Sequence, residues 1–175
     1  GQIRAGVQNV ENIIRDILAF AGNGTRRCER VLLGSVMEGV LAHVQRHVQE
    51  FGTDLQFSPE LAATWTKGDA GRIERALLNL TLNAIEAAGS GGRVWIRRAE
   101  TEVGMVAICV EDSGPGIEPE VMHKIFNPFF TTKDNGTGLG LAIVHSIADS
   151  HGGFVRAASR PGGGASFVLT LPAGE

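Results

Sequence analysis

Two glycine-rich stretches carry the most information in this chain: Asp112-Ser113-Gly114-Pro115-Gly116 and Gly136-Thr137-Gly138-Leu139-Gly140-Leu141. Glycine has no Cβ atom, so the backbone N–H groups of such a loop can closely approach a phosphate or a base. The second stretch directly precedes a predicted helix at 139–150, whose N-terminus attracts anions. Two such loops in one small domain indicate a nucleotide site.

Outward from these loops, helical and strand-like patterns alternate along the chain. Apolar residues recur at helical spacing over 2–20, 35–50, 69–88 and 139–150. Short apolar or alternating runs predict strands over 54–57, 62–66, 93–99, 105–111, 154–158 and 166–171. Helices grouped against an antiparallel-rich sheet predict an α/β (α+β) two-layer sandwich. A glycine-containing break at 21–25 separates three parts: a helix at 1–22, a linker at 23–30 and the main domain at 31–175.

The composition excludes several classes of function. Of the 175 residues, 43% are hydrophobic and 20% are charged, which is ordinary for a soluble globular protein. The formal net charge of −3, without a basic run, predicts no nucleic-acid partner. No apolar run reaches the roughly 20 residues that a bilayer requires, so we expect no direct membrane contact in this fragment. Two cysteines are too few for a disulfide framework, which fits the cytoplasm.

A polar strip runs along the predicted helix at 69–88, formed by Arg72, Arg75, Asn79, Asn83 and Glu86. Most of the remaining circumference is apolar, so the helix is expected to be largely buried. A buried amide without a partner costs about 1–3 kcal/mol, so the two asparagines need partners. They either bond to neighbouring loops, or Asn83 offers its amide oxygen to Mg²⁺ while Asn79 orients a water or the phosphates.

Asp112 follows the apolar strand pattern directly, and the end of a strand is a common place for a ligand. A carboxylate there can accept a hydrogen bond from an exocyclic amine such as adenine N6. The absence of Cβ atoms at Gly114 and Gly116 would leave room for a flat ring. The same composition also favours a simple turn, so both interpretations stay open at this point.

The order of the motifs is more specific than any one of them. Four occur in succession: Asn79-x-x-x-Asn83, Asp112-x-Gly114-x-Gly116, a Phe-rich run at 126–133, and Gly136-x-Gly138-x-Gly140. In this order they resemble the N, G1, F and G2 boxes of the ATP-binding catalytic domain of bacterial sensor histidine kinases, with similarity to the nitrogen-regulation type. The resemblance covers about residues 31–172. It implies the Bergerat-type sandwich shared with gyrase-like ATPases, with Mg-ATP held between the N-box helix and a lid at 117–137.

The resemblance also implies roles for single residues. Asn83 would be the Mg²⁺ ligand, Asp112 would recognise adenine and Lys133 would meet the γ-phosphate. Asn79, Asn83 and Lys133 form the implied catalytic set, and Ser166 falls where the family often has a threonine near the adenine pocket. The full implied set of ATP contacts is Asn79, Asn83, Asp112, Gly114, Gly116, Ile117, Phe126, Thr131, Thr132, Lys133, Gly136, Thr137, Gly138, Leu139, Gly140 and Ser166.

The implied lid at 117–137 shows weak apolar periodicity, which is typical of a segment that orders around a ligand. Phe126, Phe129 and Phe130 would anchor this lid on the core. Three phenylalanines can also simply fill a core, and the two roles are compatible.

The implied reaction is phosphoryl transfer from Mg-ATP to a histidine outside this chain. The acceptor histidine of a sensor kinase is followed by an acidic residue, and none of the five histidines here has that neighbour: His43, His47, His123, His145 and His151. The helix at 2–20 resembles the second helix of the dimerisation hairpin. The implied partners are the histidine-bearing helix of a homodimeric parent kinase and a response regulator, and the isolated chain is not expected to phosphorylate itself.

One position departs from the family pattern, and two alternative functions are considered. Glu86 stands where many of these kinases carry a basic residue that reaches phosphate, so that contact is in doubt. A nucleotide-binding regulatory module or an anti-sigma-type serine kinase of the same superfamily is an alternative function. A gyrase-like or chaperone-like ATPase would place a carboxylate at position 79 to activate water, and Asn79 is a poor base, so sustained hydrolysis is not expected.

Overall fold

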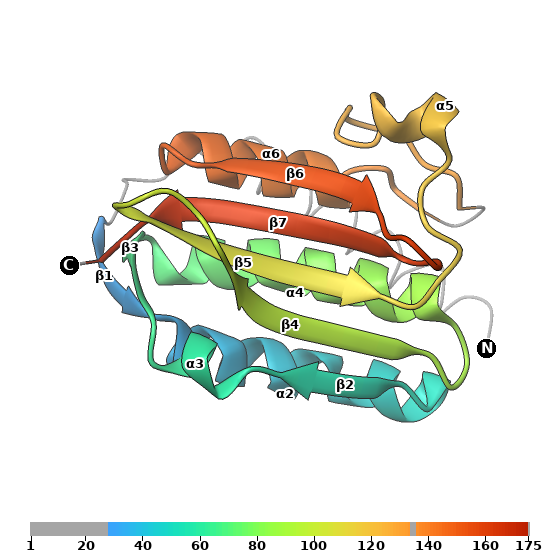
Figure 1. The fold of residues 1–175 in the computed structure, drawn as a ribbon, viewed down its shortest axis with the longest axis horizontal. Coiled ribbons are helices and arrows are strands. Elements are labelled where there is room, and N and C mark those ends of the chain that lie inside the picture. The colour runs from blue at the N-terminus through green and yellow to red at the C-terminus, as the bar shows by residue number, and fades with distance from the viewer. Residues whose placement is uncertain (1–27, 134–135, 175) are drawn as a thin grey trace, which may run out of the picture.

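The computed structural model describes residues 28–133 and 136–174 (Figure 1). Its helices are α2 (Leu33–Phe51), α3 (Pro59–Ala62), α4 (Ala70–Ala88), α5 (Pro119–Met122) and α6 (Gly140–Ser150). Its strands are β1 (Glu29–Leu32), β2 (Asp54–Phe57), β3 (Trp65–Gly68), β4 (Arg93–Ala99), β5 (Met105–Asp112), β6 (Phe154–Ser159) and β7 (Ala165–Pro172). The predicted helix at 2–20 and most of the predicted linker lie outside the described residues.

A five-stranded mixed sheet forms one layer, in the order β2-β4-β5-β7-β6. Strands β2 and β4 are parallel, and the other neighbours in this sheet are antiparallel. The long helices α2, α4 and α6 form the second layer behind the sheet in Figure 1. Strands β1 and β3 pair as a separate antiparallel ribbon. The predicted two-layer α+β sandwich is therefore confirmed.

Local signals in the sequence explain where α4 begins and ends. The Asp69 carboxylate accepts a hydrogen bond from the N–H of Arg72 at 3.1 Å and caps the first turn. The helix stops at Gly89, which has a φ of 70° that glycine adopts without strain. These two residues fix the bounds of α4 as the sequence predicts.

One predicted strand is wrong in its bounds. The pattern at 62–66 predicts a strand, whereas α3 ends at Ala62 and β3 begins only at Trp65. Pro59 occupies the first turn of α3, where its fixed φ favours a helix and its missing N–H costs nothing. The Thr64 hydroxyl then donates to the carbonyl of Glu60 at 2.8 Å, which closes the turn before the strand.

The core lies between the helices and one face of the sheet. Its fully buried side chains include Leu77 and Leu80 of α4, Ile108 of β5, Ile143 of α6 and Leu169 of β7. Burial of these apolar side chains is the main force that holds the two layers together. None of the described helices has the length and apolar content of a membrane span.

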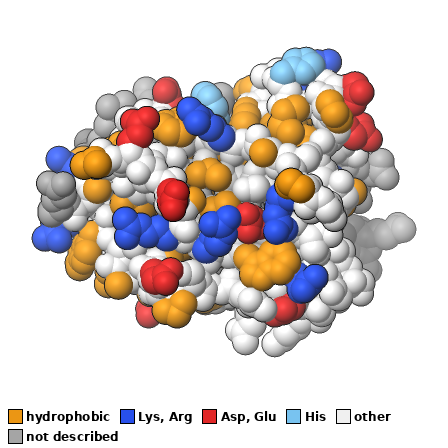
Figure 2. All heavy atoms as spheres, viewed as in Figure 1, with side chains coloured by type: hydrophobic (Ala, Val, Ile, Leu, Met, Phe, Trp, Pro, Cys, Tyr) orange, Lys and Arg blue, Asp and Glu red, His pale blue; other side chains and the backbone are white. Residues whose placement is uncertain are grey.

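Side chains alternate between the two faces of the sheet, and this decides which residues can meet. At the end of β5, Val110 and Asp112 are buried toward the helices, whereas Glu111 points to the outer face. On β4, Arg97 shares that outer face with Glu111. Figure 2 looks onto this outer face, where basic and acidic side chains are interleaved.

Candidate nucleotide site

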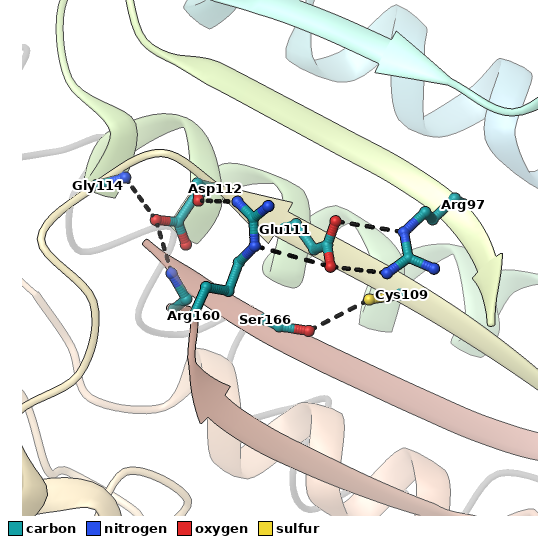
Figure 3. Close-up of polar contacts among 8 residues, drawn as sticks. Arg97, Cys109, Glu111, Asp112, Gly114, Arg160 and Ser166 are labelled. Carbon is teal, nitrogen blue, oxygen red and sulfur yellow. Dashed lines mark hydrogen bonds and ion pairs between the residues drawn. The ribbon is translucent and has the colours of Figure 1, made fainter. Parts of the chain in front are cut away.

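The carboxylate of Asp112 is the buried polar centre of the site. Asp112 ends β5 with 1% of its surface exposed. Its Oδ1 accepts hydrogen bonds from the N–H groups of Gly114 at 2.8 Å and Ala165 at 3.2 Å (Figure 3). Within 28–133 and 136–174, no donor bonds to Oδ2. Burial raises the pKa of Asp112, and the two backbone hydrogen bonds partly oppose that rise.

Close backbone packing around Asp112 depends on glycine at three positions. A Cβ atom on Gly114 would overlap the carbonyl of Ala87 at the end of α4, and one on Gly164 would overlap the carbonyl of Asp112. Gly116 has a φ of 88°, which side chains rarely allow. The glycine at 114 is therefore required by the packing of the chain itself, whether or not a ring lies beside it.

Arg160 supports the strand end from the outer face, and sequence reasoning missed it. Its Nη1 donates to the carbonyl oxygen of Asp112 at 3.1 Å, and its Nε lies 3.8 Å from the Glu111 carboxylate. Arg97 donates two hydrogen bonds to Glu111, at 3.3 and 2.8 Å (Figure 3). Because Arg97 favours the charged form, the pKa of Glu111 is lowered despite partial burial. Only the pairing of β5 with β7, which sequence alone did not give, brings Arg160 here.

The two amides of α4 lie beside the start of α6. Asn79 Nδ2 is 3.4 Å from the carbonyl oxygen of Gly140, the first residue of α6, so this hydrogen bond is long. A Cβ atom built on Gly140 would lie 3.9 Å from side-chain atoms of both Asn79 and Asn83. The structure thus brings together the asparagine motif and the second glycine stretch, as their order predicts.

Lys133 reaches the same strip of α4 from the far end of the lid segment. Its Nζ donates to Asn83 Oδ1 at 3.1 Å and to the carboxylate of Glu86. Lys133 therefore lies next to Asn83, the residue implied as the Mg²⁺ ligand. The contact with Glu86 was not predicted, because nothing in the sequence reports a pairing over this separation.

The segment at 117–133 is tied to the core at several points. Ser159 Oγ accepts the N–H of Ile117 at 3.0 Å and donates to the carbonyl of the same residue at 2.8 Å. Phe126 and Phe130 are partly buried against the core. Phe129 was also expected to anchor the lid, and this is wrong, because 70% of its surface is exposed.

Local hydrogen bonds shape the chain on both sides of positions 134–135. Thr131 Oγ1 accepts the N–H of Lys133 at 3.1 Å, and Thr137 Oγ1 accepts the N–H of Leu139 at 3.3 Å. The N–H of Gly136 donates to the carbonyl of Lys133 at 3.2 Å. Leu139 has 2% of its surface exposed, so its side chain is buried in the core and does not face a ligand. Among the expected contacts around this point, Thr131, Thr132, Lys133 and Gly136 are all exposed.

Gly138 has to be glycine for the segment to close. Its φ is 67°, and a Cβ atom there would meet the backbone of Phe129. Its carbonyl oxygen accepts the N–H of Phe129 at 2.9 Å, and Phe129 itself has a φ of 67°. The middle glycine of the second stretch thus holds the lid segment against the start of α6.

Ser166 lies apart from the other expected contacts. It follows Ala165 on β7, so its side chain points to the outer face and its Oγ lies 3.3 Å from the Sγ of Cys109 (Figure 3). The group that reaches Asp112 is the N–H of the preceding residue, Ala165. Strand alternation therefore places the Ser166 hydroxyl on the opposite face of the sheet from the Asp112 carboxylate.

The oxygen atoms on α4 fit a hard cation better than a soft one. Asn83 offers an amide oxygen and Glu86 a carboxylate, and such oxygen ligands suit Mg²⁺. No cluster of three or more His, Cys, Asp or Glu side chains occurs in the described part of the chain. A metal at this place would therefore need further oxygens, such as those of phosphates.

The sandwich, the buried carboxylate at a strand end and the glycine-rich start of α6 define the class of nucleotide-binding α+β domains. The chain belongs to the histidine kinase-, DNA gyrase B- and HSP90-like ATPase family, whose sequence profile matches residues 68–175.

Relatives within this family are sensor histidine kinases. The sensor histidine kinase ZraS of Escherichia coli is 36% identical over 163 residues, which are 93% of this chain and 35% of that protein. The catalytic domain of histidine kinase ThkA is 34% identical with a TM-score of 0.76, over 84% of this chain and 96% of that one. The chain is therefore an ATP-binding catalytic domain of the histidine-kinase type, as its four motifs predict.

Two longer structures are also similar. Full-length ShkA in complex with AMPPNP is 27% identical with a TM-score of 0.83, over 98% of this chain and 37% of that one. ThkA in complex with the response regulator TrrA is 30% identical with a TM-score of 0.81, over 98% of this chain and 49% of that one. The chain spans about a third of the length of its curated ZraS relatives.

Proposed function

We propose that this domain binds Mg-ATP between α4 and the segment at 113–140, and that it transfers the γ-phosphoryl group to a histidine outside this chain. The proposal rests on the environment of the Asp112 carboxylate. This carboxylate is buried at the strand end with Oδ1 already bonded to two backbone N–H groups, and Oδ2 remains to accept a hydrogen bond from the adenine amine.

The phosphates then extend toward α4 and α6. Backbone N–H groups at the start of α6 favour an anion, and Gly140 leaves space beside Asn79 and Asn83. Asn83 holds the Mg²⁺ ion through its amide oxygen, and Lys133 contacts the terminal phosphate. When bound, the ion neutralises charge that develops on the phosphates. Asn79 positions the phosphates through its amide and does not act as a base.

The nucleophile comes from the parent kinase, so this chain needs no general base. Its role is positioning and neutralisation of charge, which dominate catalysis of phosphoryl transfer. We propose that the acceptor histidine lies on the dimerisation helix of a homodimeric parent and that a response regulator receives the phosphoryl group. The similar kinase ThkA forms a complex with such a regulator. We place the reaction in the cytoplasm, where ATP is available.

The test is transfer in trans. The chain, incubated with γ-³²P-labelled Mg-ATP and the dimerisation fragment of its own parent, should label that fragment slowly, because the two parts are no longer tethered. The label should be lost in acid and retained in base, as expected of phosphohistidine. The chain alone should stay unlabelled. Acid-stable label on the fragment, or stoichiometric label on this chain alone, would overturn the proposal.

A further inference from the structure

Three side chains from two distant parts of the chain meet at the C-terminal end of the polar strip on α4. Asn83 and Glu86 lie about one helical turn apart and share a face of the helix. Lys133 Nζ contacts both the amide oxygen of Asn83, at 3.1 Å, and the carboxylate of Glu86. Oxygen atoms from two side chains therefore converge on one positive charge.

This arrangement does little for the stability of the fold. The side chains of Lys133 and Glu86 are 44% and 43% exposed, and ion pairs this accessible to solvent contribute little to folding. What the contact does determine is the position of a cation, because it places the ammonium group on the oxygen proposed to hold Mg²⁺.

We propose that Glu86 and Asn83 together form the cation-holding pair of the site, and that Lys133 is a built-in competitor for their oxygens. The inference rests on the proposed binding of Mg-ATP. A divalent ion and the Lys133 ammonium cannot occupy the same oxygens at once. A carboxylate is also a strong ligand for Mg²⁺, so Glu86 adds charge that the neutral amide of Asn83 lacks.

The charge of Glu86 makes nucleotide binding depend on the metal. Without a divalent ion, the carboxylate repels the phosphates nearby; with one, it attracts the ion that the phosphates share. Lys133, once released from Glu86, is free to contact a phosphate oxygen. The quantity to measure is the ratio of the Kd for nucleotide in EDTA to the Kd in excess Mg²⁺, called here the magnesium ratio.

Calorimetry with the ATP analogue AMPPNP measures this ratio. In Glu86→Gln the magnesium ratio should fall about three- to tenfold, because binding without metal improves and binding with metal weakens. Glu102→Gln is the matched control, since it removes an exposed carboxylate in the loop between β4 and β5, at the opposite end of β5 from Asp112. The control should keep the wild-type ratio. An unchanged ratio in Glu86→Gln, with nucleotide binding intact, would overturn the role of Glu86.

A second titration tests the competitor without nucleotide. Mn²⁺ binding, followed by the electron paramagnetic resonance of the free ion, should be at least about threefold tighter in Lys133→Gln than in wild type. Adding Glu86→Gln to that variant should remove the gain. Lys67→Gln, which removes an exposed lysine on β3, should behave as wild type. Equal or weaker Mn²⁺ binding in Lys133→Gln would overturn the inference. If neither wild type nor any variant binds AMPPNP, the proposed function is overturned. The Mn²⁺ titration would then still test the role of Lys133 and Glu86.

Discussion

At the residue scale, two neighbouring carboxylates on β5 have opposite pKa shifts. Burial raises the pKa of Asp112 in the folded protein above its unfolded value. The contribution of Asp112 to the free energy of unfolding therefore decreases as the pH rises from its unfolded pKa to its folded pKa. The pKa of Glu111 is lowered, chiefly by its hydrogen bonds with Arg97. Glu111 therefore adds stability above its unfolded pKa of about 4.3, and this is lost as pH falls through the folded value. Glu111 supports the strand end, whereas Asp112 remains buried at a cost that the proposed recognition of adenine would explain.

Replacing Glu111 tests this difference. Glu111→Gln should lower the free energy of unfolding at pH 7 by about 1 kcal/mol, because hydrogen bonds to a charged group are lost. The deficit should shrink as the pH falls below the ordinary range of a glutamate, where the wild-type carboxylate is also protonated. Urea unfolding at pH 7 and at a pH below that range measures the deficit, with Glu102→Gln as an exposed control. A deficit that is the same at both pH values would contradict the assignment.

At the element scale, the first turn of α6 is where we propose that phosphate binds. Gly140→Ala should fold at least as stably as wild type, because its Cβ would meet Asn79 and Asn83 only at 3.9 Å and alanine favours a helix. The same Cβ should weaken Mg-AMPPNP binding about tenfold, because it fills space needed by the ligand.

Gly71→Ala is the matched control for that prediction. Gly71 lies in the first turn of α4, where a Cβ would meet only the Asp69 carboxylate at 3.6 Å. Thermal unfolding and calorimetry of both variants separate folding from binding. Full Mg-AMPPNP affinity in Gly140→Ala would show that the phosphates lie elsewhere.

The elements themselves were largely predictable from the sequence. The cap residues Asp69 and Gly89 predict where α4 begins and ends, and the apolar run before Asp112 predicts the end of β5. The face on which Ser166 lies follows from strand alternation with the buried Phe167 and Leu169, but its contact with Cys109 depends on the register of β7 against β5 and was not predictable. The contacts of Arg160 with Asp112 and of Lys133 with Glu86 join residues far apart in sequence, and only the fold brings them together.

At the scale of the whole molecule, we propose that this chain acts together with a histidine that lies outside it. The chain spans about a third of its curated ZraS relatives, and a histidine outside the chain is needed for the proposed reaction. In this proposal the domain binds the nucleotide, and its parent supplies the acceptor histidine. Transfer in trans, described above, tests that division.

Calorimetric titration of the chain with Mg-AMPPNP is the most direct test that nucleotide binds at the Asp112 end of β5. Wild type should bind one molecule, and Ser166→Ala should bind equally well because its hydroxyl lies on the opposite face of the sheet. Asp112→Asn keeps an oxygen for the two backbone N–H groups but presents a donor to the adenine amine, so its affinity should fall about tenfold or more. Unchanged affinity in Asp112→Asn, or a loss in Ser166→Ala, would contradict the site.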